Sequence, residues 1–144
     1  MGFLKEVDHI GIAVQSLDAS LRLYTDGLGL ALDGVREVPR YRIRIAMLRC
    51  GESHLELMEP LSPEAEVARF LERRGEGLHH ICYRVEDIRE ALRACEAIGL
   101  TPITREPYLG AAGLPVVFLH PKSAHGVLVE LVEKKAPDLP GRPA

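Results

Sequence analysis

Two histidines occupy corresponding positions in the two halves of this chain. His9 and His80 each enter a short apolar run, and they coincide when the halves are overlaid at an offset of 71 residues. Two glutamates correspond as well, because Glu56 and Glu130 each stand between aliphatic neighbours, in Leu-Glu-Leu and Val-Glu-Leu. Internal repetition of this kind indicates a duplicated structural unit. The four side chains are therefore candidates for one shared site.

Two imidazoles and two carboxylates together could bind a metal ion. Strands of period two can turn all four side chains towards one cavity, and a carboxylate buried there is costly unless a cation pairs with it. The set offers nitrogen and oxygen donors but no thiolate, which disfavours a closed structural zinc site. It suits a divalent ion with open positions, such as Co, Mn, Ni or catalytic Zn. A lone histidine on a strand is more often a core residue. The metal hypothesis therefore rests on the repetition of the histidine and the glutamate in both halves.

The composition narrows the range of functions. The chain has 144 residues, 47% of them hydrophobic, enough for one compact domain with a core. Its net charge of −3 gives no electrostatic reason to expect a nucleic-acid partner. No apolar run approaches the roughly 18 residues of a membrane span, and the N-terminus lacks a signal-peptide core. Three cysteines without a close pair favour a reducing compartment, so we expect a cytoplasmic protein.

The first half of the chain is expected to hold one helix among strands. Ser16 or Asp18 can cap that helix, and Gly27 and Gly29 can end it. Alternation of polar and apolar residues predicts two later strands. The predicted elements are a strand over 7–14, a helix to about 28, an uncertain strand within 30–40, and strands over 41–48 and 54–59.

The second half repeats this order after a linking helix over 62–75, for which Ser62 and Pro63 supply the start. Asp87 is the expected cap of a helix that turns five apolar residues inward: Ile88, Ala91, Leu92, Cys95 and Ile98. The predicted strands are 79–85, 116–119 and 127–132. We therefore predict an α+β fold of two tandem βαβββ modules in one domain, 1–135. Its parts are a module of about 5–60, the linking helix, a module of about 77–134, and then a tail, 136–144.

The chain resembles the vicinal oxygen chelate, or glyoxalase-like, superfamily, and within it the methylmalonyl-CoA epimerases. The stretches that carry the resemblance are Asp8–Val14, His54–Pro60, Gly77–Ile81, Phe118–Ser123 and Gly126–Leu131. The double histidine and the later His-Pro-Lys stretch are fairly specific for the epimerases, whereas the four-ligand pattern is shared with glyoxalase I. The resemblance implies a half-open barrel around a metal site.

The resemblance also implies the site residues and the reaction. The implied metal ligands are His9, Glu56, His80 and Glu130. The implied substrate is an acyl-CoA, methylmalonyl-CoA, whose 2R and 2S forms would interconvert by α-proton abstraction through a metal-stabilised enolate. Glu56 and Glu130 are the candidate bases, since a pseudo-twofold axis would set them on opposite sides of the metal. Some epimerases carry glutamine at the position of Glu56, and the catalytic glutamate assigned to the third strand of one member falls near Arg44 here.

Other residues carry weaker functional hypotheses. His79 adjoins a ligand but points to the opposite sheet face, so it is interpreted as structural or as a partner of the ligand. Lys122 and Ser123 lie on a predicted turn where a lysine could meet a CoA phosphate, although the pattern favours a solvated surface lysine. Gly113 belongs to a small-residue loop along which a pantetheine arm could pass, and an ordinary loop explains these residues equally well.

Two other functions fit parts of the pattern. Glyoxalase I, a lactoylglutathione lyase, would use the same ligands on a glutathione hemithioacetal. A protein of this fold that only sequesters small molecules would have no use for the matching histidines and carboxylates. A ring-cleaving dioxygenase ranks lowest, since it needs only three protein ligands. Exposed sheet edges are commonly covered by dimerisation in this superfamily, so we expect a homodimer.

Overall fold

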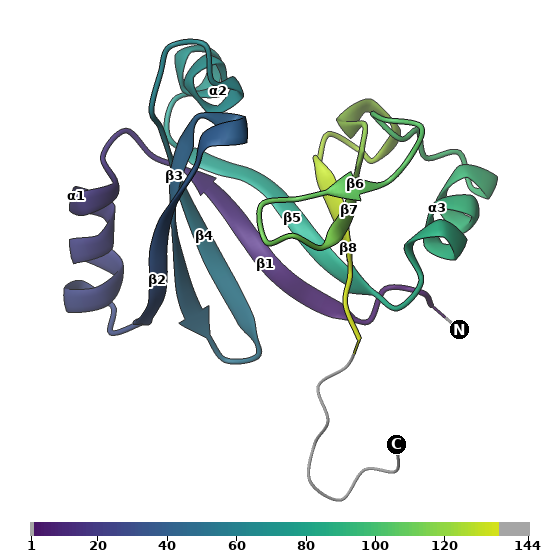
Figure 1. The fold of residues 1–144 in the computed structure, drawn as a ribbon, viewed down its shortest axis with the longest axis horizontal. Coiled ribbons are helices and arrows are strands. Elements are labelled where there is room, and N and C mark those ends of the chain that lie inside the picture. The colour runs from purple at the N-terminus through teal and green to yellow at the C-terminus, as the bar shows by residue number, and fades with distance from the viewer. Residues whose placement is uncertain (1, 136–144) are drawn as a thin grey trace, which may run out of the picture. The chain divides into compact units, whose positions relative to one another are not determined.

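A computed structural model describes residues 2–135 of the chain, so the predicted tail over 136–144 lies outside the described residues. The described residues form two compact units (Figure 1): Val7–Cys82, and the flanking segments 2–6 and 83–135. Each half of the chain follows the predicted βαβββ order, with one helix linking the halves. No helix within 2–135 is long and apolar enough to cross a membrane.

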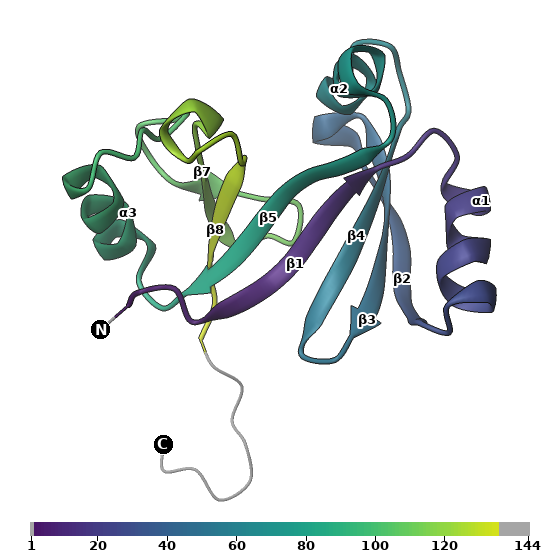
Figure 2. The same ribbon diagram turned by 180° about the vertical axis from the view of Figure 1, so that it is seen from behind.

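The unit Val7–Cys82 is built on five strands. Its elements are β1 (Glu6–Ala13), α1 (Leu17–Arg22), a π-helical turn (Leu23–Gly27), β2 (Ala31–Val38), a 3-10 turn (Pro39–Tyr41), β3 (Ile43–Cys50), β4 (Ser53–Pro60), α2 (Glu66–Arg74) and β5 (Gly77–Val85). The strand order is β2-β3-β4-β1-β5. Strand β1 runs parallel to β4, and β3 runs antiparallel to both of its neighbours. Figure 2 shows β1 and β5 side by side.

The face of the sheet that packs against α1 determines which side chains face away from it. The core on this face consists of Val14, Leu17, Ala46, Leu48 and Leu57, with Ile12, Leu21, Tyr24, Leu30 and Leu55 partly buried around them. Because successive side chains of a strand alternate between faces, Leu55 and Leu57 on the α1 side place Glu56 on the other side. The same alternation places His9 and Gly11 of β1 opposite Ile12.

The second unit holds the remaining elements. They are α3 (Ile88–Ala97), β6 (Tyr108–Leu109), β7 (Pro115–Leu119), a 3-10 turn (Pro121–Ser123) and β8 (Val129–Glu133). With the end of β5, the strand order here is β5-β8-β7-β6. Helix α3 packs against a core of Val85, Ile88, Ala91, Leu92, Cys95, Val117, Leu119 and Leu131.

Corresponding carboxylates secure the helix start in both halves. Of the two candidate caps of the first helix, Ser16 is the cap and accepts from Ala19 N, while the predicted cap Asp87 accepts from Glu90 N. A glutamate from the last strand of each half adds a second contact: Glu59 accepts from Leu17 N at 2.7 Å and Glu133 accepts from Ile88 N at 3.0 Å. Each contact satisfies a backbone donor that the helix itself leaves without a partner. The duplication thus extends from the histidines to the helix ends.

Some predicted boundaries differ from the structure. Helix α2 begins at Glu66 rather than near Ser62, because Ser62 O accepts from Ala65 N in a turn and Ala65 is extended. Ile98 was predicted to face inward but is 73% exposed, since it is the C-cap of α3 and has left the helical register. The uncertain stretch 30–40 holds β2, and the two-residue strand β6 was not predicted.

Gly11 is the point at which a side chain from β5 covers β1. A Cβ added at Gly11 would meet Cε1 and Nδ1 of His80 well inside van der Waals contact. The His80 side chain is only 4% exposed, so its ring has little room to move aside. The absence of a side chain at Gly11 is therefore what allows the His80 ring to lie where it does.

Replacing Gly11 by alanine is expected to lower the free energy of unfolding by about 1–3 kcal/mol, the usual cost of overpacking a filled interior. Urea denaturation of the metal-free protein measures this. Gly34→Ala is the matched control, because a Cβ at Gly34, also on a strand, would meet nothing within 4 Å. Equal stabilities of the two variants would contradict the contact between Gly11 and His80.

Candidate metal centre

Three of the four predicted ligands meet on one face of the first unit. Strand β1 pairs with β4 so that Gly11 lies opposite Glu56 and His9 lies opposite His54. His80 reaches the same place from β5, the other neighbour of β1. The parallel pairing of β1 with β4 and the alternation of side chains are enough to bring Glu56 beside His9.

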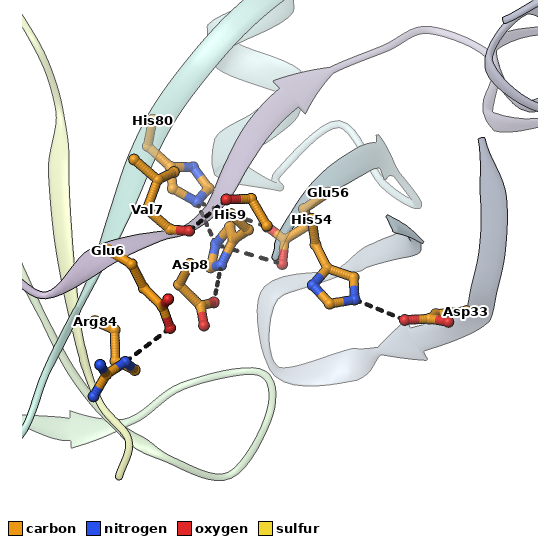
Figure 3. A network of polar contacts seen from close by, with 10 residues as sticks. Glu6, Val7, Asp8, His9, Asp33, His54, Glu56, His80 and Arg84 are labelled. Atoms are coloured by element: carbon orange, nitrogen blue, oxygen red, sulfur yellow. Dashed lines mark hydrogen bonds and ion pairs between the residues drawn. The ribbon is translucent and has the colours of Figure 1, made fainter. Parts of the chain in front are cut away.

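The donor atoms of these three residues face one another (Figure 3). Nε2 of His9 lies 3.1 Å from Nε2 of His80. The Glu56 carboxylate lies 4.0 Å from the His9 nitrogen and 3.8 Å from the His80 nitrogen, too far for hydrogen bonds. The side chains are largely buried, with 11% of His9, 4% of His80 and 12% of Glu56 exposed. Water is therefore largely kept from the space between them.

Each histidine of the cluster also has a polar partner at its other ring nitrogen, Nδ1. Nδ1 of His9 lies 2.7 Å from the Asp8 carboxylate, and Nδ1 of His80 lies 2.9 Å from Nδ1 of His79. The His79 ring packs edge-on against Phe70 of α2, at 4.8 Å between centroids. The interpretation of His79 as a partner of the ligand agrees with this contact. With Nδ1 engaged in both rings, Nε2 is the atom that each presents to Glu56.

The arrangement fits a divalent metal ion. Two imidazole nitrogens bound at 2.0–2.1 Å at a right angle around one ion lie about 3.0 Å apart, close to the spacing seen here. Outer hydrogen-bond partners on Nδ1 are the usual companions of ligating histidines. His9, Glu56 and His80 would together supply two nitrogens and a carboxylate, a donor set without sulfur that suits first-row divalent ions.

The other predicted site residues belong to the second unit. Glu130 lies on β8 opposite Phe118 and is buried, with 8% exposed. Its membership of the metal site stays a prediction. Lys122 is exposed, and Ser123 donates to His120 O while accepting from Thr101 N. Gly113 has φ +76 in a turn between β6 and β7. Their roles towards a substrate also stay predictions.

Two further polar groups of the first unit have partners of their own. Arg44, near the position of the relative's third-strand glutamate, pairs with Asp18 at 3.3 Å and with Glu59 at 3.5 Å. Asp33 of β2 lies 2.7 Å from Nε2 of His54, and this hydrogen bond, together with Arg49, lowers the pKa of the Asp33 carboxyl. Asp33 and His54 thus form a second carboxylate–histidine pair, outside the metal cluster.

Sequence reasoning missed three residues of this neighbourhood: Asp8, Gly11 and Cys82. Atoms of Asp8, His9 and Cys82 lie within 4.8 Å of one another, and Gly11 makes room for His80. The same offset of 71 could have found them, because it overlays Asp8 on His79 and Gly11 on Cys82. Such a pattern shows up only when the neighbours of the repeated histidines are compared as well.

Comparison with known proteins places the chain in one family. The pattern of the Glyoxalase/Bleomycin resistance protein/Dioxygenase superfamily matches residues 8–118. An ethylmalonyl-CoA/methylmalonyl-CoA epimerase of Cereibacter sphaeroides is 37% identical over 87% of this chain and 95% of its own length. A probable lactoylglutathione lyase of Vibrio cholerae is 28% identical over 88% of this chain and 89% of its own.

Solved structures give the same assignment. A hypothetical protein from Bacillus halodurans C-125 is 46% identical, with a TM-score of 0.88 over 93% of this chain and 97% of that one. A methylmalonyl-CoA epimerase in complex with methylmalonyl-CoA and ammonium is 35% identical, with a TM-score of 0.85 over 92% and 96%. The predicted glyoxalase-like fold is confirmed. The chain belongs to the Glyoxalase/Bleomycin resistance protein/Dioxygenase superfamily and, within it, to the group that contains the methylmalonyl-CoA epimerases.

Proposed function

We propose that the chain is an isomerase that interconverts the 2R and 2S forms of methylmalonyl-CoA with the help of a divalent metal ion. The observation that carries the proposal is the buried cluster of His9, Glu56 and His80, in a chain of the epimerase group. A relative solved with methylmalonyl-CoA bound supports an acyl-CoA as the substrate.

Each residue of the cluster has a role in this proposal. His9, His80 and Glu56 would hold the metal, with Glu130 as the fourth ligand. The bound ion would supply Lewis-acid polarisation of the substrate's thioester and carboxylate oxygens, which makes the hydrogen on the carbon between them more acidic. Burial of the cluster strengthens every charge interaction made there, because little water screens it.

Epimerisation also needs a proton acceptor on one face of that carbon and a proton donor on the other face. One carboxylate takes the proton from C2, and another group returns a proton to the other face. We assign these roles to Glu56 and Glu130, which correspond in the duplication. A carboxylate that holds a metal would be a weak base, so the carboxylate that accepts the proton would have to be free of the ion while it does so.

The activity is tested by following the C2 hydrogen of methylmalonyl-CoA in D2O by NMR. The protein is expected to exchange this hydrogen for deuterium and to equalise the two epimers, and removal of the metal with a chelator is expected to abolish both. Lactoylglutathione formation from the glutathione hemithioacetal is measured beside it. Turnover of the hemithioacetal alone would identify a glyoxalase I, and turnover of neither substrate would favour a sequestering protein.

Glu130→Gln is expected to lower kcat for epimerisation by on the order of 10²–10⁴-fold, because it removes a general acid–base group. Glu56→Gln should give a smaller or equal loss, since glutamine occupies this place in some epimerases. Metal content is measured for both variants. Glu52→Gln, in an exposed turn, is the control. A Glu130→Gln protein with full turnover and bound metal would refute the assignment of Glu130.

We further propose a cytoplasmic homodimer. Strand β2 stands at one end of the strand order and is exposed at seven of its eight residues. Leu32 and Val35 on it are 46% and 45% exposed, so a second copy could bury apolar surface there. Light scattering coupled to gel filtration is expected to give twice the chain mass of 15.9 kDa. A Leu32→Lys, Val35→Lys double variant should run as a monomer, and an unchanged dimer would place the interface elsewhere.

A further inference from the structure

The residue before each cluster histidine contacts that histidine's Nδ1, in both halves of the duplication. Asp8 precedes His9 and His79 precedes His80, and the offset of 71 overlays Asp8 on His79. The two contacts measure 2.7 Å and 2.9 Å. The equivalent positions therefore do the same structural task with chemically different side chains, a carboxylate in one half and an imidazole in the other.

The carboxylate determines where His9 carries its hydrogen. An ionised carboxylate only accepts hydrogen bonds, whereas a neutral imidazole has one donor nitrogen and one acceptor nitrogen. In the neutral ring, Nδ1 of His9 therefore donates to Asp8, and Nε2 of His9 keeps its lone pair. This is the nitrogen that faces Glu56 and His80, so His9 is prepared for a metal before one binds.

The contact between the two Nε2 atoms then orders the rest of the network in the metal-free protein. At 3.1 Å one of the two must donate, and because His9 offers a lone pair, His80 donates. Nδ1 of His80 is then an acceptor, and Nδ1 of His79 donates to it at 2.9 Å. The hydrogens thus run in one direction from His79 to Asp8.

A metal ion would reverse only the second half of this network. To bind through Nε2, His80 must carry its hydrogen on Nδ1 and donate it to His79. His79 must then accept on Nδ1 and hold its own hydrogen on Nε2. A neutral imidazole can make this exchange without a change of charge, whereas an ionised carboxylate at position 79 has no hydrogen to donate in the metal-free form. Asp8 therefore only needs to accept a hydrogen bond from His9, whereas His79 needs to donate to His80 without metal and to accept from His80 with metal.

We propose that Asp8 and His79 are positioning residues of the metal centre. Asp8 fixes the hydrogen of His9 on Nδ1 at all times, and His79 exchanges between donor and acceptor as His80 takes up the metal. The part played by His79 rests on the proposed metal function, whereas the part played by Asp8 applies to the metal-free protein as well.

The test reads ring tautomers directly. Long-range 1H–15N NMR of histidine-labelled protein is recorded without metal and with Zn²⁺, which is diamagnetic. His9 should keep its hydrogen on Nδ1 in both states. The hydrogen of His80 should move from Nε2 to Nδ1 when Zn²⁺ is added, and that of His79 should move from Nδ1 to Nε2. A His79 hydrogen that stays in place, while Zn²⁺ binds to His80, would overturn the role of His79.

Variants separate positioning from simple packing. In Asp8→Asn the amide can donate or accept, so His9 should become a mixture of tautomers and Zn²⁺ affinity should fall by about 10–100-fold. Asp33→Asn removes the charge from the other carboxylate–histidine contact of 2.7 Å and should leave Zn²⁺ affinity unchanged. His79→Gln keeps a side chain that can donate or accept and should retain most of the affinity, which His79→Leu should lose.

The outcomes distinguish this inference from the proposed function. If the wild-type protein binds no Zn²⁺, the proposed metal function and the exchange at His79 both fail, and the metal-free spectra of Asp8→Asn still decide the role of Asp8. If the wild-type protein binds Zn²⁺ and Asp8→Asn matches Asp33→Asn in affinity and in the tautomer of His9, Asp8 has no positioning role. Denaturation curves of the metal-free variants show whether each is folded.

Discussion

Two imidazole nitrogens 3.1 Å apart in a place that little solvent reaches impose a strict condition on their surroundings. Two lone pairs cannot face each other at that distance, so either a hydrogen or a cation must lie between them. The neighbouring residues hold the two rings in this arrangement. Strands β1 and β5 are adjacent, Gly11 leaves space for the His80 ring, and Asp8 and His79 hold the outer nitrogens. Glu56, on the next strand over, adds the negative charge that a divalent cation would balance.

The duplication explains why so few residues build the cluster. The histidines, their preceding residues and the helix starts at Leu17 and Ile88 all repeat at 71 residues. The glutamate pairs, Glu56 with Glu130 and Glu59 with Glu133, repeat at 74 instead. The three additional residues of the second half fall between its helix and its last strand, where connecting segments can absorb them without disturbing the strands. The difference in length between the two halves therefore lies outside the strands and helix starts that position the site residues.

Much of the fold could be predicted because its signals are local. Capping residues such as Asp87 and the period-two pattern of β4 report on neighbours a few residues away, and both were predicted correctly. Gathering His9, Glu56 and His80 required only the repeat and the alternation of faces. The contacts of Asp8 and the space at Gly11 could not be predicted in this way, because they depend on side-chain rotamers and on the separation of two strands. Ile98 shows a similar limit, since its spacing fits the apolar stripe while the helix ends one residue earlier.

We propose that the two halves of the chain place matching histidines on one metal ion. Anomalous X-ray diffraction from crystals grown with Co²⁺ tests it most directly, because it locates the ion without reference to activity. We expect one strong peak per chain at bonding distance from Nε2 of His9, Nε2 of His80 and the Glu56 carboxylate, with Glu130 as the fourth ligand. A peak bonded to other residues, or no peak in crystals that contain Co²⁺, would contradict it.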